Sequence, residues 1–194
     1  MPSLRSNLLK EVDNSQLILF RIIYGFLLVA EAWGAILTGW VRRVFIEPKL
    51  NFPFIDFSFL QPLEGNGMLY YYFIMGVFGI GIMLGFRFRI SIIIYTLMWA
   101  GVYYMQKTSY NNHYYLLLVF NFIFCFLPAS QYASFDAKHQ LTLKNSYCPL
   151  WCIWIFKAFI LLIYFYSAIA KMYPAWIDAI PIKIWFTAKS NYWL

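Results

Sequence analysis

Long apolar stretches are the feature that most constrains how this chain folds. The first runs from residue 17 to about residue 41, and others cover about 68–86, 90–105, 113–128 and 149–170. A transmembrane helix needs roughly 20 predominantly apolar residues and tolerates about 17. The third and fourth stretches reach that length only when flanking polar residues are included. The pattern predicts an all-α integral membrane protein, a bundle of about five transmembrane helices.

Composition excludes a water-soluble globule. Hydrophobic residues make up 62% of the 194 residues and charged residues only 12%, whereas a soluble domain averages about 45–50% and about 25%. So few charges could not cover the surface of a soluble core. The net charge of +7 is spread along the chain, which favours loops facing anionic lipid. We therefore expect the lipid bilayer, and no nucleic acid, as a partner.

The domain organisation is simple. Residues 1–16 form a polar N-terminal segment, and 17–194 are predicted to be a single transmembrane helical domain. The first apolar run is too long for a signal-peptide core and no small-residue cleavage site follows, so we expect a retained span. Several prolines between residues 42 and 67 prevent a regular helix. Their aromatic neighbours favour a loop in the membrane interface, and the chain after Lys171 has the same character.

Charge counting alone does not orient the bundle, because Lys and Arg divide evenly between its two sides. Arg87 and Arg89, in the tight turn between the second and third spans, favour a cytoplasmic N-terminus by the positive-inside rule. With five spans, alternation places the turn 107–113, the proline-rich loop and Lys171 together on the opposite face. We expect the candidate site on that face of a multi-pass membrane protein.

The first candidate cluster is KTSYNNH, residues 107–113. One interpretation is a helix cap, in which Ser109, Asn111 or Asn112 accepts hydrogen bonds from the free N–H groups that begin the next helix. The other is functional. His113 would lie at a helix N-terminus, where the dipole keeps the imidazole neutral. A neutral ring beside two carboxamides can both donate to and accept from a ligand.

The second cluster ends the last apolar run. Tyr164, Ser167 and Lys171 are spaced to share one helical face. One interpretation is a lysine whose ammonium reaches the headgroups. In the other, low-dielectric surroundings favour the neutral amine, which can act as a base, although a helix C-terminus favours the cation.

Arg21, Glu31 and Lys157 are ionisable residues inside predicted spans. Such charges are costly in a bilayer and usually face the bundle interior, so we expect structural intramembrane charges. A direct Glu31–Lys157 pair requires helix tilt or a reaching lysine side chain, because the two residues are predicted at different depths.

The cysteines and histidines do not suggest a metal centre. Cys125, Cys148 and Cys152 form neither a disulfide framework nor a CxxC pair. His139 is predicted in a loop on the opposite side from His113, which argues against a bis-histidine haem. We expect no metal and no haem.

Glycines in the second span predict a close helix contact. Gly81 and Gly85 are separated by three residues, and Gly76 and Gly79 precede them. Small residues at this spacing let two membrane helices approach closely. A phosphate-binding loop is not expected, because neither a strand nor a Lys-Ser/Thr pair accompanies the glycines.

Two longer motifs carry a family resemblance. The stretch YYFIMGVFGIGIMLGFRFRIS, followed by QKTSYNNHYYLL, resembles the membrane domain of the vitamin K-dependent gamma-carboxylase family, which has bacterial members. The family motif K-T-S-W-N-N-H matches residues 107–113, and its motif ending in lysine matches YFYSAIAK at residues 164–171. The resemblance covers about residues 20–194.

The resemblance implies a chemistry and assigns roles to residues. Lys171 would be the catalytic base and His113 a second catalytic residue. Tyr110, Asn111 and Asn112 would bind the cofactor, a reduced naphthoquinone similar to vitamin K hydroquinone. Oxygen and carbon dioxide would be co-substrates. Oxygenation of the quinol would generate a base that deprotonates a glutamate side chain, to which carbon dioxide adds.

Departures from the family pattern leave alternatives open. Tyr110 replaces the family tryptophan, and Gln131 and Ala133 stand where the family has histidine and tryptophan. Family enzymes continue into further spans and a substrate-binding domain that this sequence does not include. We expect a bacterial-type homologue of the N-terminal part: a fragment, or the membrane half of an enzyme whose other half is a second chain. The alternative is a non-catalytic membrane subunit or maturation factor with the same helical domain.

Overall fold

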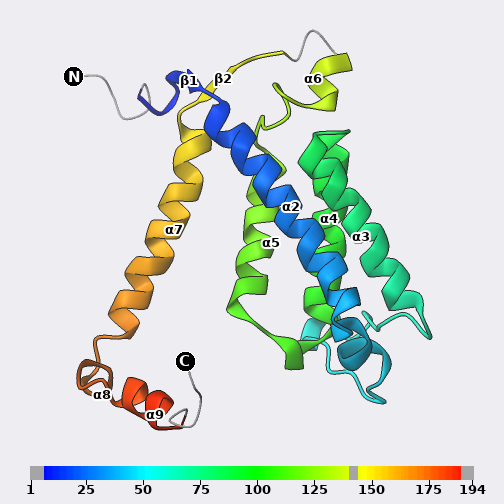
Figure 1. Ribbon diagram of the computed structural model, residues 1–194, viewed down its shortest axis with the longest axis vertical. Coiled ribbons are helices and arrows are strands. Elements are labelled where there is room, and N and C mark those ends of the chain that lie inside the picture. Colours follow the sequence, from blue (N-terminus) through cyan, green and yellow to red (C-terminus); the bar gives the residue numbers. More distant parts are fainter. Residues whose placement is uncertain (1–6, 140–143, 189–194) are drawn as a thin grey trace. The chain divides into compact units, whose positions relative to one another are not determined.

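A computed structural model describes residues 7–139 and 144–188. They divide into two compact units, Met1–Cys152 and Ile153–Leu194, and each is described by itself. The first unit is a helical bundle in which consecutive helices pack against each other (Figure 1). Its long helices are α2 (Ser15–Leu37), α3 (Gly67–Leu84), α4 (Phe88–Met105) and α5 (Asn112–Phe124). The fold class is therefore the predicted all-α membrane bundle.

Each predicted span coincides with a helix, but the helices differ in length. Among the described residues, α2, α3, α4 and α7 (Trp151–Ala170) are long and apolar enough to cross a membrane. The fourth predicted span, 113–128, contains only the 13-residue helix α5. At about 1.5 Å per residue this helix is about 20 Å long, shorter than the roughly 30 Å hydrocarbon core. By length alone, α5 is therefore shorter than a membrane-spanning helix, and the count of five spans stays a prediction.

The segment around α5 nevertheless runs along most of α2. At its beginning, the Tyr114 ring lies 6.1 Å from the ring of Trp40, which follows the C-terminal end of α2. At its end, the carbonyl of Pro128 accepts a 3.3 Å hydrogen bond from the Asn14 carboxamide, directly before α2 begins. The helix ends early because the chain turns after Phe124. The Arg89 guanidinium donates to the carbonyls of Cys125 and Phe126 in this turn, where a cation suits a helix C-terminus.

Small residues bring α2 and α3 into close contact. A Cβ atom at Gly25 would lie 2.6 Å from the Met83 backbone. On the facing side, a Cβ atom at Gly76 would overlap the Trp33 indole, and one at Gly79 would lie 2.9 Å from Val29. The predicted close approach is confirmed at Gly76 and Gly79.

The close approach is also confirmed at Gly81, where the neighbouring helix is α4, but not at Gly85, which lies outside the helix. A Cβ atom at Gly81 would meet the Ser91 hydroxyl, 2.5 Å away on α4. Gly85 lies after the end of α3 with φ +66°, the left-handed conformation that closes a helix. The three-residue spacing is common to a packing face and to a glycine cap, so the sequence pattern did not separate them.

The buried polar groups of the bundle are mostly bonded across helices. The Tyr24 hydroxyl donates to the Asn121 carboxamide (2.8 Å), and the Tyr95 hydroxyl donates to the Leu28 carbonyl (2.9 Å). Large apolar side chains are exposed on α2, α3 and α4, as expected where lipid replaces water.

The proline-rich segment between α2 and α3 contains no α-helix. It forms a π-helical turn at Arg42–Ile46 and a 3₁₀ turn at Ile55–Phe57, with irregular chain elsewhere. This agrees with the helix-breaking effect expected of its prolines.

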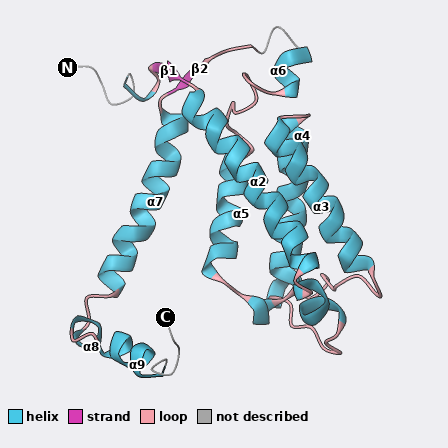
Figure 2. Cartoon of the chain, viewed as in Figure 1, coloured by secondary structure: helices cyan, strands magenta, loops and turns pink. Residues whose placement is uncertain are grey.

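A short strand pair lies outside the helices. Strand β1 (Glu11–Asp13) pairs antiparallel with β2 (Tyr147–Pro149), with Val12 opposite Cys148 (Figure 2). The N-terminal segment is therefore not only a polar tail, because it is bonded to the chain that leads into α7. Three-residue strands carry too little alternation for sequence reasoning to find them.

The second unit contains most of α7 and two short helices, α8 (Pro174–Ile177) and α9 (Ile180–Ala188). Pro174 begins α8, where its missing N–H costs nothing. Helices α8 and α9 pack against each other, and the Trp176 and Trp185 rings lie 5.9 Å apart.

Candidate functional site

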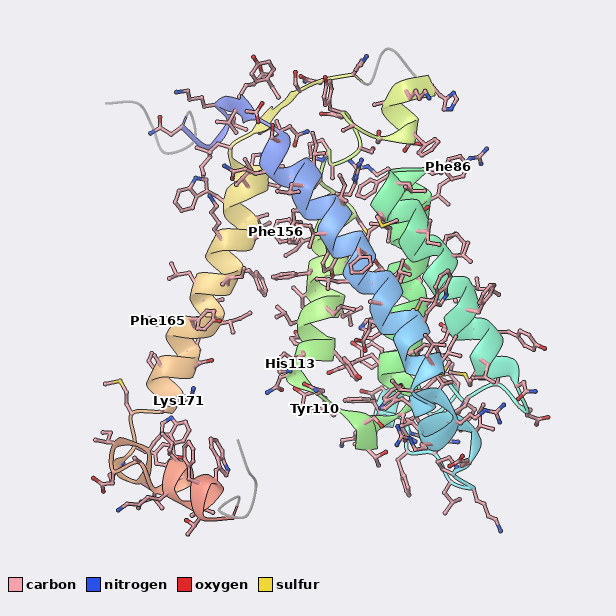
Figure 3. All side chains as sticks on the ribbon, in the orientation of Figure 1. Phe86, Tyr110, His113, Phe156, Phe165 and Lys171 are labelled. Carbon is pink, nitrogen blue, oxygen red and sulfur yellow. The ribbon has the colours of Figure 1, made fainter. Side chains whose placement is uncertain are left out.

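The turn between α4 and α5 holds the KTSYNNH residues. Lys107–Ser109 form a 3₁₀ turn, Tyr110 leaves it with ψ 129°, and Asn111 is the extended residue before α5. Figure 3 shows His113 at the beginning of α5 and Tyr110 in the preceding turn.

Asn111 makes two hydrogen bonds with one oxygen. Its Oδ1 accepts from the His113 backbone N–H (2.9 Å) and lies 2.7 Å from the His113 ring Nδ1. Because a carboxamide oxygen only accepts, Nδ1 is the donor in this contact, and Nε2 is the ring nitrogen that can accept a hydrogen bond from a ligand. The capping interpretation is confirmed for Asn111. The same contact also orients the histidine, so the two interpretations are not exclusive.

Tyr110 and Asn112 are tied to each other beside the histidine. The Tyr110 hydroxyl donates to Asn112 Oδ1 at 2.8 Å, which leaves the Asn112 amide N–H groups as donors. The Tyr110 side chain is 53% exposed, and its ring lies 6.1 Å from that of Tyr103. An exposed aromatic face, a ring acceptor and an amide donor therefore lie within four consecutive residues.

Gln106 anchors this turn to the proline-rich loop. Its buried side chain donates to the Val44 carbonyl (3.2 Å) and to the Asn51 carboxamide (3.1 Å), and accepts from the Phe52 N–H (3.1 Å). The backbone N–H of Lys107 also donates to the Phe52 carbonyl at 2.7 Å. The predicted placement of these two segments on one face is confirmed.

Aromatic rings also pack together at this end of the bundle. The Phe57 and Tyr104 rings stack at 4.2 Å, Phe54 stacks on Tyr103 at 5.4 Å, and the Lys107 ammonium lies 5.9 Å from the Phe54 ring. The two stacked ring pairs join the loop to α4.

The cavity beside the turn is small. It measures about 10 Å³, about what one water needs, and Tyr110 and Tyr114 are among its lining residues. A ring-sized ligand does not fit inside it. The exposed sides of Tyr110 and His113 are the part of the turn open to such a ligand.

Lys171 lies in the second unit. Its backbone N–H donates to the Ala168 carbonyl (3.0 Å), and its ammonium lies 5.4 Å from the Trp176 ring, a position in which an indole attracts a cation. The Tyr164 side chain is 72% exposed. Because Lys171 and His113 belong to different units, their cooperation stays a prediction.

The other predicted charges lie in separate surroundings. Glu31 is half-buried on α2 in the first unit. In the second, the Lys157 ammonium lies 5.7 Å from the Trp154 ring. A Glu31–Lys157 pair therefore stays a prediction.

Arg21 is buried, with 1% of its surface exposed. Its Nη1 donates to the Ala129 carbonyl at 3.2 Å and its Nη2 to the Ala133 carbonyl at 2.6 Å. The chain following α5 is thereby bound to the beginning of α2. Sequence reasoning identified the charge but not these partners, which are more than 100 residues away.

A family model described as the HTTM domain matches residues 9–194, almost the whole chain. No solved structure matches the chain. The match covers the helical bundle, the KTSYNNH turn and Lys171.

Proposed function

The chain belongs to the HTTM domain family, the transmembrane domain of vitamin K-dependent gamma-carboxylases, and from this premise we propose that it binds a reduced naphthoquinone. In the proposal, the chain couples quinol oxygenation to glutamate carboxylation, alone or as the membrane half of a two-chain enzyme. The observation that carries the proposal is the hydrogen-bonded Asn111–His113 pair, which leaves Nε2 free to accept beside the exposed Tyr110 ring.

The residues at the turn suit a quinol chemically. A quinol has a flat aromatic ring and hydroxyl groups at opposite positions. Tyr110 offers a ring face for stacking, and His113 Nε2 can accept a hydrogen bond from one hydroxyl. The Asn112 amide can donate to a ligand oxygen. When bound, the quinol supplies reaction with oxygen, which yields a base strong enough to deprotonate glutamate before carbon dioxide adds.

Tyr110 stands where the family has tryptophan. A phenol is smaller than an indole, but its hydroxyl bonds Asn112 at 2.8 Å and orients that carboxamide. We infer that tyrosine keeps the stacking surface while adding a fixed orientation for Asn112.

Lys171 takes the role of base in this proposal through its match to the family motif. A neutral amine would have to replace the ammonium that now lies near Trp176. That aromatic contact favours a non-catalytic membrane subunit or maturation factor as the second candidate, because it stabilises a cation.

Turnover by the purified full chain tests the proposal. Wild-type protein in nanodiscs, given reduced naphthoquinone, oxygen, labelled bicarbonate and a glutamate peptide, should oxidise the quinol and label the peptide. His113→Ala should lower the rate by at least about 100-fold, because a positioned proton acceptor contributes about that much. His139→Ala removes the other histidine and should leave the rate unchanged. Full activity in His113→Ala would refute the role of the turn.

Lys171→Ala tests the base independently. It should abolish carboxylation while quinol binding and expression persist. Carboxylation at the wild-type rate in this variant would exclude Lys171 as the base. A wild-type chain that binds quinol but turns over only with a second protein, captured from the native membrane and identified by mass spectrometry, would indicate a two-chain enzyme. Quinol binding without turnover in either setting would favour the non-catalytic subunit.

A further inference from the structure

An open cleft of about 650 Å³ lies at the other end of the first unit, away from the KTSYNNH turn. It is lined by Arg21 and Ile22 near the beginning of α2 and by Met83 and Leu84 at the end of α3. Figure 3 labels Phe86 in the turn that follows α3. Because the beginning of α2 and the end of α3 are ends of membrane-spanning helices, the cleft is at the level where the lipid headgroups lie.

The described lining is basic. Arg21, Lys138 and Lys144 contribute cations, and no acidic residue is among the lining residues that the structure describes. Asp136 acts on Arg21 electrostatically, but its carboxylate accepts from the N–H groups of Arg87 (2.7 Å) and Phe88 (2.9 Å), outside the cleft. The cleft therefore has a surplus of positive charge.

Arg21 is the fixed cation of this cleft. Among the described residues, its two side-chain hydrogen bonds go to neutral carbonyls, which orient the guanidinium without cancelling its charge. Its Nε is buried and has no hydrogen-bond partner among the described residues. A buried charge that no carboxylate of the described residues contacts directly is costly in a membrane protein, so an anion in the cleft would stabilise the native state.

The rest of the lining is apolar and open. Ile22, Leu84 and Phe135 are 39%, 41% and 44% exposed, and all three line the cleft. A free anion would make no favourable contact with these side chains, whereas the acyl chain of a lipid would pack against them. Positive charge at the headgroup level, beside an apolar surface, suits a lipid with an anionic headgroup.

We propose that this cleft binds an anionic phospholipid, with its phosphate bonded by the exposed Lys138 and Lys144 over the buried charge of Arg21, and an acyl chain against Ile22 and Leu84. Ammonium groups form strong charge-assisted bonds to phosphate, and the buried guanidinium adds attraction through its charge. The bound lipid would hold α2, the end of α3 and the segment before residue 139 together at this side of the membrane. This site is independent of quinol binding.

Thermal unfolding of the purified full chain with added lipid tests the proposal. Phosphatidylglycerol should raise the midpoint in a saturable, concentration-dependent way, and phosphatidylcholine should not. The variant Lys138→Gln/Lys144→Gln changes only exposed side chains, so it should fold yet bind phosphatidylglycerol about tenfold or more weakly. The matched control Lys10→Gln/Lys49→Gln removes two exposed lysines outside the cleft and should bind as the wild type does.

Each other outcome overturns the proposal. Equal stabilisation by inorganic phosphate would show a free-anion site rather than a lipid site. Equal stabilisation by phosphatidylcholine would show that charge is not recognised. An equal loss of phosphatidylglycerol affinity in the control variant would show a general effect of net charge. Unchanged affinity in Lys138→Gln/Lys144→Gln would show that the lipid does not bind in the cleft.

Discussion

The two ends of the first unit are stabilised in different ways. At the end where α2 begins, the chain is held by the buried Arg21 guanidinium, by Gly85 in the left-handed conformation and by the Asp136 carboxylate. These contacts leave the backbone little conformational freedom. At the other end, Gln106 and stacked rings anchor the turn, while Tyr110 and His113 stay exposed. The first arrangement suits a rigid support, and the second leaves functional groups accessible to a ligand.

The largest expected effect is the loss of Arg21. Arg21→Ala removes two hydrogen bonds and leaves the Ala129 and Ala133 carbonyls without their donor, which should cost about 3 kcal/mol of unfolding free energy. Arg43→Ala is the matched control, because exposed Arg43 donates to one backbone carbonyl, that of Thr38, and should change stability by less than about 0.5 kcal/mol. Denaturant unfolding in detergent measures both. Equal losses of unfolding free energy in Arg21→Ala and Arg43→Ala would contradict the view that Arg21 fixes its end of the unit.

Gly85 gives the next largest effect. Gly85→Ala forces alanine into the left-handed region, at about 1–2 kcal/mol, and places a Cβ atom 2.5 Å from Arg21 Nη1. Gly65→Ala has the same backbone cost at φ +60° with no atom within 4 Å. The difference between the two unfolding free energies isolates the steric contact. A Gly85→Ala variant no less stable than Gly65→Ala would show that the close approach is absent.

A substitution of Asn111 separates helix capping from the orientation of His113 at the exposed end. Asn111→Ser keeps a good helix cap, so stability should change by less than about 0.5 kcal/mol. Its shorter side chain does not hold the His113 ring, so quinol turnover should fall by about tenfold or more. Parallel measurement of unfolding and turnover separates the roles. Unchanged turnover would mean that the cap alone explains Asn111.

The smallest expected effect is at Asp13 on β1. The Ser15 side chain and the Ser15 backbone N–H, which donates to the carboxylate at 2.9 Å, lower the pKa of Asp13. A depressed carboxyl pKa contributes stability above the unfolded-state value, and that contribution is lost progressively as the pH falls below about 4. The melting temperature of Asp13→Asn should therefore be slightly below wild type at pH 7, and the difference should shrink as the pH is lowered below about 4. A constant difference would contradict this.

The positions of the helices could be predicted from the sequence, because a long apolar run in a membrane protein must form a helix and the run itself marks where that helix lies in the chain. Sequence reasoning also found the Asn111 cap, since capping depends on neighbouring residues. The Arg21 partners were beyond its reach, because Ala129 and Ala133 are distant in sequence and bind through backbone carbonyls of no particular residue type. Gln106 gave no signal either, since its partners lie in an irregular loop.

Nitrogen NMR of the histidine rings tests the central claim most directly, because the chain has only 2 histidines and His139→Ala assigns both. The account predicts that His113 carries its proton on Nδ1 and that its Nε2 resonance shifts on addition of a reduced naphthoquinone, while His139 does not respond. A His113 ring protonated on Nε2, or an Nε2 resonance that saturating quinol leaves unchanged, would contradict it.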